Sequence, residues 1–595
     1  MLQRVSDYIA HALLENGISQ VFTVVGGGAM YLNDSFGHCL SLDVTYNHHE
    51  QACAIAAEGY ARVNNQMAAV CVTTGPGATN AITGVAGAWM DSIPMLIISG
   101  QARYATTVYA SGLKLRTRGI QEFDIIGSVS NMTKYCELVN DPSRVKYCLE
   151  KAIYLAKEGR PGPCWLDIPL DVQGAIIDPD SLHGYQPMEI KSYDVPAETV
   201  NAIVCALMKA SKPLIFAGNG IRLSGAHEKF VELVEYSGIP VISGMGSVDA
   251  LESDHPCYVG REGTTGTRAG NFAVQNCDFL LSIGSRQSFL QTGFDVNNWA
   301  PKAFKVINDI DCEELKRKDL NPDIVVWGDA CSLINQLYNL LVMKAMPDWS
   351  SWKKRCAFWK SQYPVVTEKH YQNKSISIYA FYKEMTKQLS ANEDIVVGVG
   401  TSRVAGSQAA IIKKGQRFYA NPTMAAMGYD LPAAIGVCIA KKKARIALVT
   451  GEGSIQMNIQ ELQTIVHNKL PIAIYIMNNQ GYHSIRMTQN NFFNPPLVGV
   501  GDESGDLSFP NLCNLAYAYG IPYYRVDNTS ELIAEMKKIQ EVHAPFICEV
   551  ILSVDQTTEP KVSSQRLEDG TMISASLENM APFLSQEELS RNMKG

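Results

Sequence analysis

Short apolar runs alternate with helix-periodic segments along most of the chain. Between residues 20 and 170 the apolar runs are VFTVVG, VTYNHHE, AAVCVTTG, PMLIISG and PCWLDIP, and helical spacing is clear over 52–63 and about 81–90. A second series (PLIFAG, IPVIS, DFLLSIG and FKVIND) follows, and a third begins near Ile376. Buried strands that alternate with helices are typical of parallel sheets covered on both faces. We therefore predict an α/β protein with three doubly wound parallel-sheet domains.

Changes in composition separate the three series. A proline-bounded strand ends the first series, a polar irregular stretch follows near 180–195, and 346–375 is rich in Trp, Lys, Tyr and Ser without a clear period. At a prior of about 150 residues per domain, a chain of 595 residues also exceeds a single core. We predict an N-terminal domain over 1–180, a central Rossmann-like domain over 190–345, a C-terminal domain over 375–555 and a tail over 556–595. The succession suggests an internal triplication, and the tail is either a lid over the site or a surface strap.

Charge and composition narrow the class of protein. The formal net charge is −8 and long basic runs are absent, which argues against a nucleic-acid-binding surface. The 15 cysteines show no CxxC or paired spacing, so we expect reduced thiols and a cytoplasmic protein. No apolar run reaches the ~18 residues of a spanning helix, and the chain enters an amphipathic helix at once. We expect neither a membrane span nor a targeting segment.

The stretch 445–479 carries the strongest chemical signal. Two apolar runs, one ending at Gly451-Glu452-Gly453 and one at Asn478-Asn479, are joined by helical spacing over 455–466. This pattern predicts two adjacent parallel strands, with Glu452 and Asn479 at the carboxyl-end edge where such sheets bind ligands. Their oxygens suit Mg²⁺, and a helix after Ser454 would offer its N–H groups to a phosphate. A diphosphate held through a divalent cation is the prediction; an ordinary strand-helix-strand unit with polar caps is the alternative.

Several motifs, in order, resemble one enzyme family. Gly-Glu-Gly followed about two dozen residues later by Asn-Asn is similar to the thiamine-diphosphate signature, with Glu452 where the family usually has aspartate. The motifs that resemble the acetohydroxyacid (acetolactate) synthase large-subunit branch are GGGAM at 26–30, HEQACAIAAEGYAR at 49–62, TTGPGATNAITG at 73–84, DSIPMLIISGQ at 91–101, GRPGPCWLDIP at 159–169 and MGYDLPAAIG at 427–436. The resemblance covers nearly the whole chain. It implies a pyrimidine-binding N-terminal domain and a diphosphate- and Mg²⁺-binding C-terminal domain.

The resemblance also implies catalytic and metal-binding residues. Glu50 would bond the pyrimidine ring of thiamine diphosphate and promote loss of the thiazolium C2 proton, although alone it could equally be a solvated acid at a helix start. The other residues expected beside the reacting atoms are Gln121 and Gly28. The expected Mg²⁺ ligands are Glu452, Asn479 and the carbonyl of Gly481.

Further cofactor contacts follow from the same resemblance. Met427 would wedge between the two rings of the cofactor and so set its bent conformation. Ala425 would accept a hydrogen bond from the aminopyrimidine through its carbonyl. The remaining expected contacts are Pro76, Asn80, Gly451, Gly453, Ser454 and Tyr482. In the family, the glutamate equivalent to Glu50 serves cofactor bound by another subunit, so we expect a homodimer or homotetramer with the active site at a subunit interface.

Departures from the family pattern indicate the reaction. Simple 2-oxoacid decarboxylases of the superfamily carry a glutamate just after the paired asparagines and a histidine pair before residue 120; neither occurs in 481–486 or 104–119. We therefore expect decarboxylation of a small 2-oxoacid, such as pyruvate, and addition of the acyl unit to a carbonyl acceptor. The family's bulky acceptor walls are replaced by Thr488, Ser484 and Ile120.

The identity of the acceptor is a separate prediction. Segments 481–489 and 559–572 resemble the branch found with nucleotide-sugar genes, which points to a nucleotide-linked keto sugar. Three alternatives stay open: acetolactate synthesis from two pyruvates, lyase chemistry on a 2-hydroxyacyl thioester, and a non-catalytic regulatory paralogue that binds the cofactor.

Other polar residues give weaker predictions. Arg116, Arg118 and Arg486 are candidates for binding an anionic acceptor, although loop arginines are more often solvated. The candidate proton shuttles are His48, His49 and His483, of which His49 is the most typical of a structural residue. The residues that match a flavin site in the central domain are Gly218, Gly220, Arg286, Asp309 and Asp329. Because a structural α/β domain needs no ligand, FAD is an open alternative here.

Overall fold

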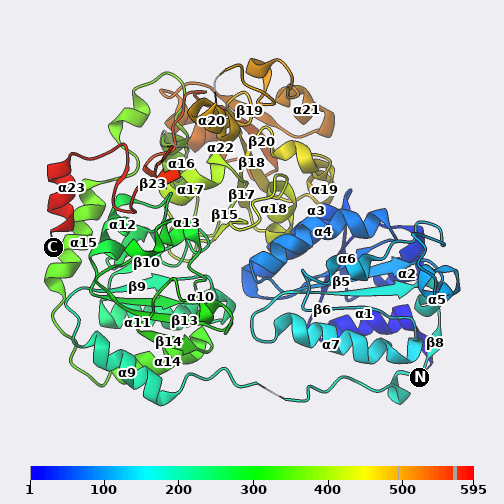
Figure 1. Cartoon of the computed structure of the whole chain (residues 1–595). Coiled ribbons are helices and arrows are strands. Elements are labelled where there is room, and N and C mark those ends of the chain that lie inside the picture. The colour runs from blue at the N-terminus through cyan, green and yellow to red at the C-terminus, as the bar shows by residue number, and fades with distance from the viewer. Residues whose placement is uncertain (1, 190, 494, 567–571, 595) are drawn as a thin grey trace.

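The computed structural model describes residues 2–189, 191–493, 495–566 and 572–594; for 564–566 and 572–574 only the backbone is described. Three bodies are visible in Figure 1, coloured blue to cyan, green, and yellow to orange along the chain. Each is built on one six-stranded sheet whose paired strands all run parallel, which confirms the predicted α/β class. In the described ranges, no helix is both long and apolar enough to cross a membrane.

The N-terminal sheet has the strand order β3-β2-β4-β5-β7-β6. Its strands are β2 Gln20–Thr23, β3 Asp43–Tyr46, β4 Ala69–Val72, β5 Met95–Gln101, β6 Tyr135–Leu138 and β7 Pro163–Pro169. Its main helices are α1 Val5–Glu15, α2 Met30–His38, α3 Glu50–Asn64, α4 Pro76–Met90 and α7 Val145–Lys157. Within β5, Ile97 packs into one core and Leu96 and Ile98 into another, so both faces are buried.

Helices α3 and α4 begin earlier than their apolar spacing suggests, because local capping extends them. The Nδ1 atom of His49 accepts a hydrogen bond from the backbone N–H of Gln51 at 3.1 Å, which lets α3 start at Glu50. Gly75 has a φ of 63° and precedes Pro76 in the first turn of α4, a position that proline favours. Gly75 is therefore the last residue of a tight turn that runs straight into the helix.

The C-terminal sheet has the order β16-β15-β17-β18-β20-β19. Its strands are β15 Asp394–Val397, β16 Phe418–Tyr419, β17 Ile446–Gly451, β18 Ile472–Asn478, β19 Tyr523–Val526 and β20 Phe546–Ile551. Its main helices are α16 Ile378–Gln388, α17 Thr401–Ala409, α18 Asp430–Ala440, α19 Glu461–Asn468, α20 His483–Phe492, α21 Leu512–Tyr519 and α22 Leu532–Gln540. β17 and β18 pair in parallel from Ile446↔Ile472 to Gly451↔Met477, as predicted.

The single helix predicted over 455–466 is wrong. A 3₁₀ turn, η8 Ile455–Asn458, follows Ser454, and α19 begins only at Glu461. The Glu461 carboxylate is buried and accepts hydrogen bonds from Asn47 Nδ2 at 2.9 Å and from the N–H of His48 at 3.0 Å. The start of α19 therefore faces the loop after β3, and the segment directly after Ser454 is a short 3₁₀ turn instead of the first turn of one long α-helix.

The central sheet has a different topology, β11-β10-β9-β12-β13-β14. Its strands are β9 Pro213–Ala217, β10 Val241–Ser243, β11 Tyr258–Arg261, β12 Phe279–Ile283, β13 Phe304–Asp309 and β14 Ile324–Trp327. Its main helices are α9 Ala197–Leu207, α11 His227–Ser237, α12 Arg268–Asn276 and α14 Ala330–Leu341. In chain order this is 3-2-1-4-5-6, the nucleotide-binding arrangement, whereas both outer sheets are 2-1-3-4-6-5. The suggested triplication therefore does not extend to the central sheet.

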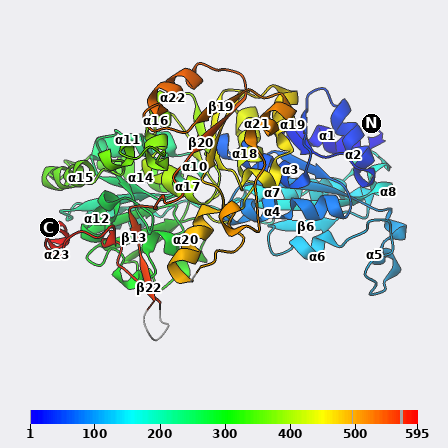
Figure 2. The ribbon, with the colours of Figure 1, turned by 90° about the horizontal axis from the view of Figure 1, so that it is seen from above.

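Helices α3 and α18 bring the two outer sheets together. A Cβ on Gly436 of α18 would lie 1.9 Å from the carbonyl oxygen of Ala56, and one on Gly59 of α3 would lie 2.6 Å from that of Ala433. Alanines from both helices share one buried core. Figures 1 and 2 both place blue α3 beside yellow α18. The two helices thus pack backbone against backbone.

The C-terminal tail runs back to the central sheet as a strap. Its helix α23, Gln586–Met593, packs against α15, Ser350–Gln362, and the Trp359 indole donates to Asn592 Oδ1 at 2.9 Å. Arg268 of α12 donates to the carbonyl of Met580 at 3.1 Å. The red tail lies over the green central body in Figure 1. The described part of the tail is therefore a surface strap on the central body, as in the second of the two alternatives. Its first residues pass close to α20.

Candidate functional site

A buried carboxylate meets a backbone turn where β17 and β18 end. Glu452 Oε1 accepts hydrogen bonds from the N–H groups of Asn479 at 3.1 Å and Gly481 at 2.7 Å. Glu452 is 3% exposed and Asn479 is 6% exposed. The parallel pairing of the two strands thus brings together three residues that lie far apart in the sequence. They are the three expected metal ligands.

The oxygens of this turn suit a cation. One terminal atom of the Asn479 amide points at Glu452 Oε1, 3.2 Å away, and at the Gly481 carbonyl oxygen, 2.8 Å away. If this inward atom is the amide nitrogen, it donates a hydrogen bond to both oxygens. With its oxygen turned inward, three oxygens converge with no side-chain donor between them, which is the arrangement a hard cation binds. Burial raises the pKa of Glu452 to about 7 despite the two backbone N–H donors.

A metal here would depend on more than acidic side chains. Among the residues that the structure describes, no three His, Cys, Asp or Glu side chains gather as a metal site. One carboxylate, one amide and one carbonyl leave half of an octahedral shell to a ligand such as a diphosphate or to water. The donor set fits a metal that arrives with its phosphate, rather than a cage made by the protein alone.

The turn after β17 leaves room for a ligand at one glycine and not at the next. A Cβ on Gly451 would meet nothing within 4 Å, whereas one on Gly453 would lie 2.3 Å from Cε1 of the Tyr482 ring. Ser454 Oγ accepts from the N–H of Gly428 at 3.1 Å, which ties this turn to the segment before α18. Tyr482 therefore covers Gly453, and the backbone near Gly451 is the open part.

A second group of expected residues lies at the carboxyl-end edge of the N-terminal sheet. Glu50, the first residue of α3, accepts from Asn80 Nδ2 at 3.0 Å through Oε2. A Cβ on Gly77 would lie 3.4 Å from Glu50 Oε1, so the first turn of α4, which starts at Pro76, packs closely against this carboxylate. Glu50 is half-buried, unlike a solvated acid at a helix start.

Gly28 and Gln121 lie around the same edge. The N–H of Gly28 donates to Thr73 Oγ1 at 3.0 Å, beside the turn that opens α4. Gln121 has a φ of 57°, and a Cβ on Gly75 would lie 2.3 Å from its carbonyl oxygen. The loop that carries Gln121 therefore rests on this turn, and both residues are close to the surroundings of Glu50.

Ala425 and Met427 lie on a turn that residues missed by the sequence analysis hold in place. Ala425 has a φ of 52°, and its N–H donates to Asn421 Oδ1 at 2.8 Å. Asn421 Nδ2 donates in turn to Glu58 Oε1 at 3.4 Å, and Glu58 is 1% exposed within α3. A charged residue inside the alanine-rich run of α3 was the one signal in the sequence for this role. Met427 is 40% exposed in the single chain.

The two groups of residues touch through Asn458. Its Nδ2 donates to Gln51 Oε1 at 2.9 Å and to the Gly428 carbonyl at 2.7 Å. Gln51 is the neighbour of Glu50, while Glu50 itself bonds Asn80. Asn458 was also missed, because nothing in its local sequence distinguishes it from other polar residues of a helical segment.

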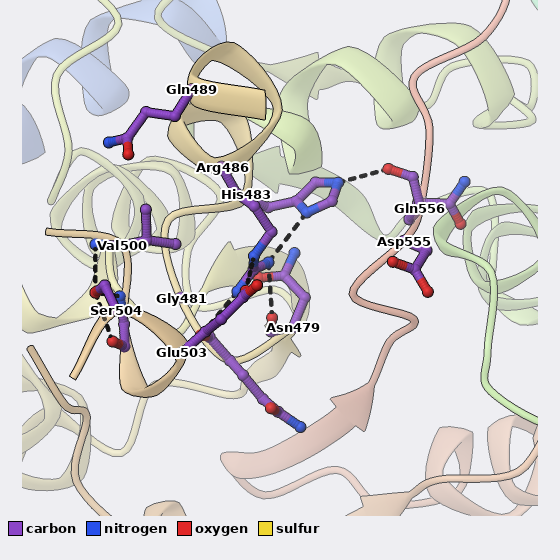
Figure 3. A network of polar contacts seen from close by, with 12 residues as sticks. Asn479, Gly481, His483, Arg486, Gln489, Val500, Glu503, Ser504, Asp555 and Gln556 are labelled. Atoms are coloured by element: carbon purple, nitrogen blue, oxygen red, sulfur yellow. Dashed lines mark hydrogen bonds and ion pairs between the residues drawn. The ribbon is translucent and has the colours of Figure 1, made fainter. Parts of the chain in front are cut away.

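The interpretation of Arg486 as an acceptor-binding loop arginine is wrong. Arg486 lies in α20, is 4% exposed, and donates to the carbonyls of Asn479 at 3.1 Å and Gln480 at 3.0 Å (Figure 3). Arg116 and Arg118 are exposed, and Arg118 donates to the carbonyl of Ala105 at 3.1 Å.

The three histidines also differ in their surroundings. His49 caps α3, which is the structural role expected of it, and His48 is exposed. His483 is buried and bonds the Gln556 carbonyl at 2.6 Å through Nε2. Burial lowers the pKa of His483, which favours its neutral form.

A cavity of about 650 Å³ opens at the central sheet, where the order of the strands reverses between β9 and β12, and residues of both outer bodies, such as Arg160 and Thr423, also line it. Ligands bind at such points in open α/β sheets. The five residues expected at a flavin site all line it: Gly218, Gly220, Arg286, Asp309 and Asp329. A Cβ on Gly218 would lie 2.2 Å from the Gly284 carbonyl oxygen, so the contact between the two turns already requires this glycine. Burial raises the pKa of Asp309 to about 6.

Comparison with known proteins matches most of the chain to one enzyme family. Models of the thiamine pyrophosphate enzyme family match the chain in three parts: the N-terminal TPP binding domain over 3–127, the central domain over 200–337 and the C-terminal TPP binding domain over 398–550. The probable acetolactate synthase large subunit of Methanocaldococcus jannaschii is 30% identical over 565 residues, covering 92% of this chain and 91% of the relative.

Two further relatives are similar over a comparable span. The acetolactate synthase isozyme 3 large subunit of Escherichia coli is 28% identical over 90% of this chain and 92% of its own. Acetolactate synthase 2, chloroplastic, of Nicotiana tabacum is 30% identical over 94% of this chain and 83% of its own.

We expect Glu452→Gln to separate cofactor binding from the stability of the empty protein. A neutral amide costs less to bury than a carboxylate, so the melting temperature without ligands should not fall. The rise in melting temperature on adding thiamine diphosphate and Mg²⁺ should shrink, because a charged metal ligand is lost. Thermal unfolding with and without both ligands checks this. Glu531→Gln, at an exposed position, is the control, and an equal rise in both variants would contradict the expectation.

Proposed function

The chain belongs to the thiamine pyrophosphate enzyme family and is an enzyme of the acetolactate synthase type, and on this premise we propose its substrates. Decarboxylation of a 2-oxoacid and carboligation of the acyl unit follow from the family. We infer pyruvate as the donor and a nucleotide-linked keto sugar as the acceptor. The observation that carries the thiamine diphosphate chemistry is the meeting of Glu452, Asn479 and Gly481 at one sheet edge, and the choice of acceptor is supported by the polar groups near α20 described below.

In the proposed mechanism, Glu452, the Asn479 amide and the Gly481 carbonyl would hold Mg²⁺ together with the diphosphate of the cofactor. Thiamine diphosphate, when bound, would supply the carbon nucleophile and take up the electron pair that stays behind when CO₂ leaves. Glu50 would share a proton with the pyrimidine ring, and Asn80 fixes the position of its carboxylate. Met427 would support the cofactor from the side.

Polar groups near α20 support a hydroxylated acceptor. Ser484 Oγ lies 3.3 Å from Thr401 Oγ1, and Thr488 is exposed on the same side of the helix, four residues further on. A cavity of about 550 Å³ between α20 and the tail adds amide and hydroxyl side chains, among them Asn490, Asn491 and Thr558. Such groups bond sugar hydroxyls. The names of the relatives favour the alternative of acetolactate formation from two pyruvates.

Exposed apolar side chains on the site loops support a homo-oligomer. In the single chain Met424 is 37% exposed, Met427 40% and Ile485 47%, and on the loop that carries Gln121 the exposure of Ile120 reaches 88%. Apolar side chains gathered around a site mark a surface that another molecule covers. We propose that a second subunit does so, and that Glu50 of one subunit serves cofactor held by the other. The fifteen free thiols support a cytosolic enzyme.

We also propose that the central cavity takes a flavin or a similar dinucleotide, as the strand order at its position supports. The proposed reaction transfers no net electrons, so this ligand would act structurally. Denaturing the purified protein and recording the absorbance spectrum of the supernatant tests this. A flavin spectrum is the expected result. The proposal would be contradicted if the supernatant showed no flavin absorbance and the protein also bound no flavin after incubation with FAD.

Glu50→Gln should separate catalysis from binding. The amide still accepts from Asn80, so folding and cofactor affinity should be kept, but it cannot share a proton with the pyrimidine ring. Turnover should fall at least ~10²-fold, the low end for general acid–base participation. Glu228→Gln, at an exposed acid in the first turn of α11, is the matched control. Unchanged turnover in Glu50→Gln would remove the role proposed for it, whereas no turnover in the wild-type protein would favour the non-catalytic alternative.

Product analysis tests the choice of acceptor. Purified protein is incubated with pyruvate, thiamine diphosphate and Mg²⁺, alone and with nucleotide-linked 4-keto sugars, and the products are identified by mass spectrometry. We expect a sugar adduct that carries a two-carbon acyl unit, with little acetolactate. Acetolactate as the main product in both reactions would instead establish the two-pyruvate alternative.

A further inference from the structure

We propose that Arg486 is a positioning residue that holds the 479–481 turn in the shape needed to bind a divalent cation. This rests on the metal ligands proposed above, but it concerns a residue that the mechanism does not use. Arg486 touches neither the proposed metal nor the substrate. It acts through the backbone of the turn.

The turn has an unfavourable backbone that needs external support. Gln480 has a φ of 61° and Gly481 a φ of 145°, two successive residues in the region that L side chains rarely adopt. A Cβ on Gly481 would lie 2.3 Å from the Val500 carbonyl oxygen, so the turn also fits closely under the next segment. Local preferences alone therefore do not set this shape.

Arg486 holds both peptide groups around Gln480. Its Nη1 donates to the Asn479 carbonyl at 3.1 Å and its Nη2 to the Gln480 carbonyl at 3.0 Å. The rigid fork of a guanidinium fixes two carbonyls at once, which a lysine ammonium cannot do with the same geometry. Figure 3 shows the side chain reaching down from α20 to the turn. With these two peptide planes fixed, the Cα atoms of Asn479 and Gly481, from which two of the proposed ligand groups extend, are held in place.

Arg486 is itself held by two further side chains, one from its own helix and one from the segment after it. Its Nε donates to Glu503 Oε2 at 2.9 Å, and its Nη1 lies 3.3 Å from His483 Nδ1. His483 bonds the Gln556 carbonyl at 2.6 Å, so the support continues into the start of the C-terminal tail (Figure 3). A guanidinium that is 4% exposed and bonded on all three nitrogens has little freedom to turn toward a substrate.

The charge of Arg486 and its contacts with the turn predict opposite changes in metal affinity when the residue is replaced, which makes the proposal testable. A guanidinium beside a metal site repels the cation, so removing it should tighten metal binding if Coulomb interaction dominates. If the clamp dominates, removing it should weaken metal binding. Residues that orient metal ligands typically change affinity by about 10–100-fold when replaced.

The experiment measures Mn²⁺ binding by full-length Arg486→Met and Arg486→Lys in the presence of thiamine diphosphate, from the electron paramagnetic resonance signal of free Mn²⁺. We expect the dissociation constant to rise about 10–100-fold in Arg486→Met and less in Arg486→Lys. In activity assays the metal concentration for half-maximal rate should rise, while the rate at saturating Mg²⁺ is largely restored. Arg525→Met, which removes a half-exposed arginine paired with Asp527, is the matched control and should bind like wild type.

Unchanged or tighter Mn²⁺ binding in both Arg486 variants would overturn the proposal. If Arg486→Met fails to fold, as judged by circular dichroism, Arg486→Lys must itself bind Mn²⁺ more weakly for the proposal to stand. A wild-type protein that binds Mn²⁺ and thiamine diphosphate without consuming pyruvate would count against the proposed substrates only. The comparison of metal affinities would remain valid, so the two failures are distinguishable.

Discussion

The close contact between α3 and α18 is the constraint on which the site depends. Where Gly436 meets Ala56 and Gly59 meets Ala433, the two backbones leave no room for a side chain. α3 begins at Glu50, and α18 follows directly after the turn that carries Met427. A single packing contact therefore sets where residues of the N-terminal sheet stand relative to residues of the C-terminal sheet. Interiors packed to this density change shape little, so the placement is rigid.

Buried polar groups also fix the position of the two outer sheets relative to each other. Glu58 and Glu461 are each about as buried as the apolar core, and each accepts hydrogen bonds from across the boundary between the two sheets. A buried carboxylate without donors would be costly, so each of these bonds favours one arrangement over others. Burial raises the pKa of Glu452 to about 7 despite its two N–H donors. The amide of Asn479 and the carbonyl of Gly481 beside it complete a set of oxygens that suits a cation.

The central sheet contributes in another way. Its strand order differs from that of the outer sheets, and its own cavity lies at the reversal point rather than beside Glu452. The tail straps across this body through Met580 and α23 after leaving α20 near Gln556. A continuous set of contacts thus leads from the 479–481 turn to the central body, through segments distant in sequence.

Local pattern was enough to predict the α/β class, the parallel pairing of β17 with β18, and the meeting of Glu452 with Asn479. These features follow from short-range periodicity and from the rule that parallel strands end at one edge. The break before α19, the support of Ala425 by Asn421 and Glu58, and the burial of Arg486 against the 479–481 turn were decided only by tertiary structure. Each depends on a partner remote in the sequence or on a competing contact, such as Glu461 with Asn47, and hydrophobic spacing contains no information about such partners.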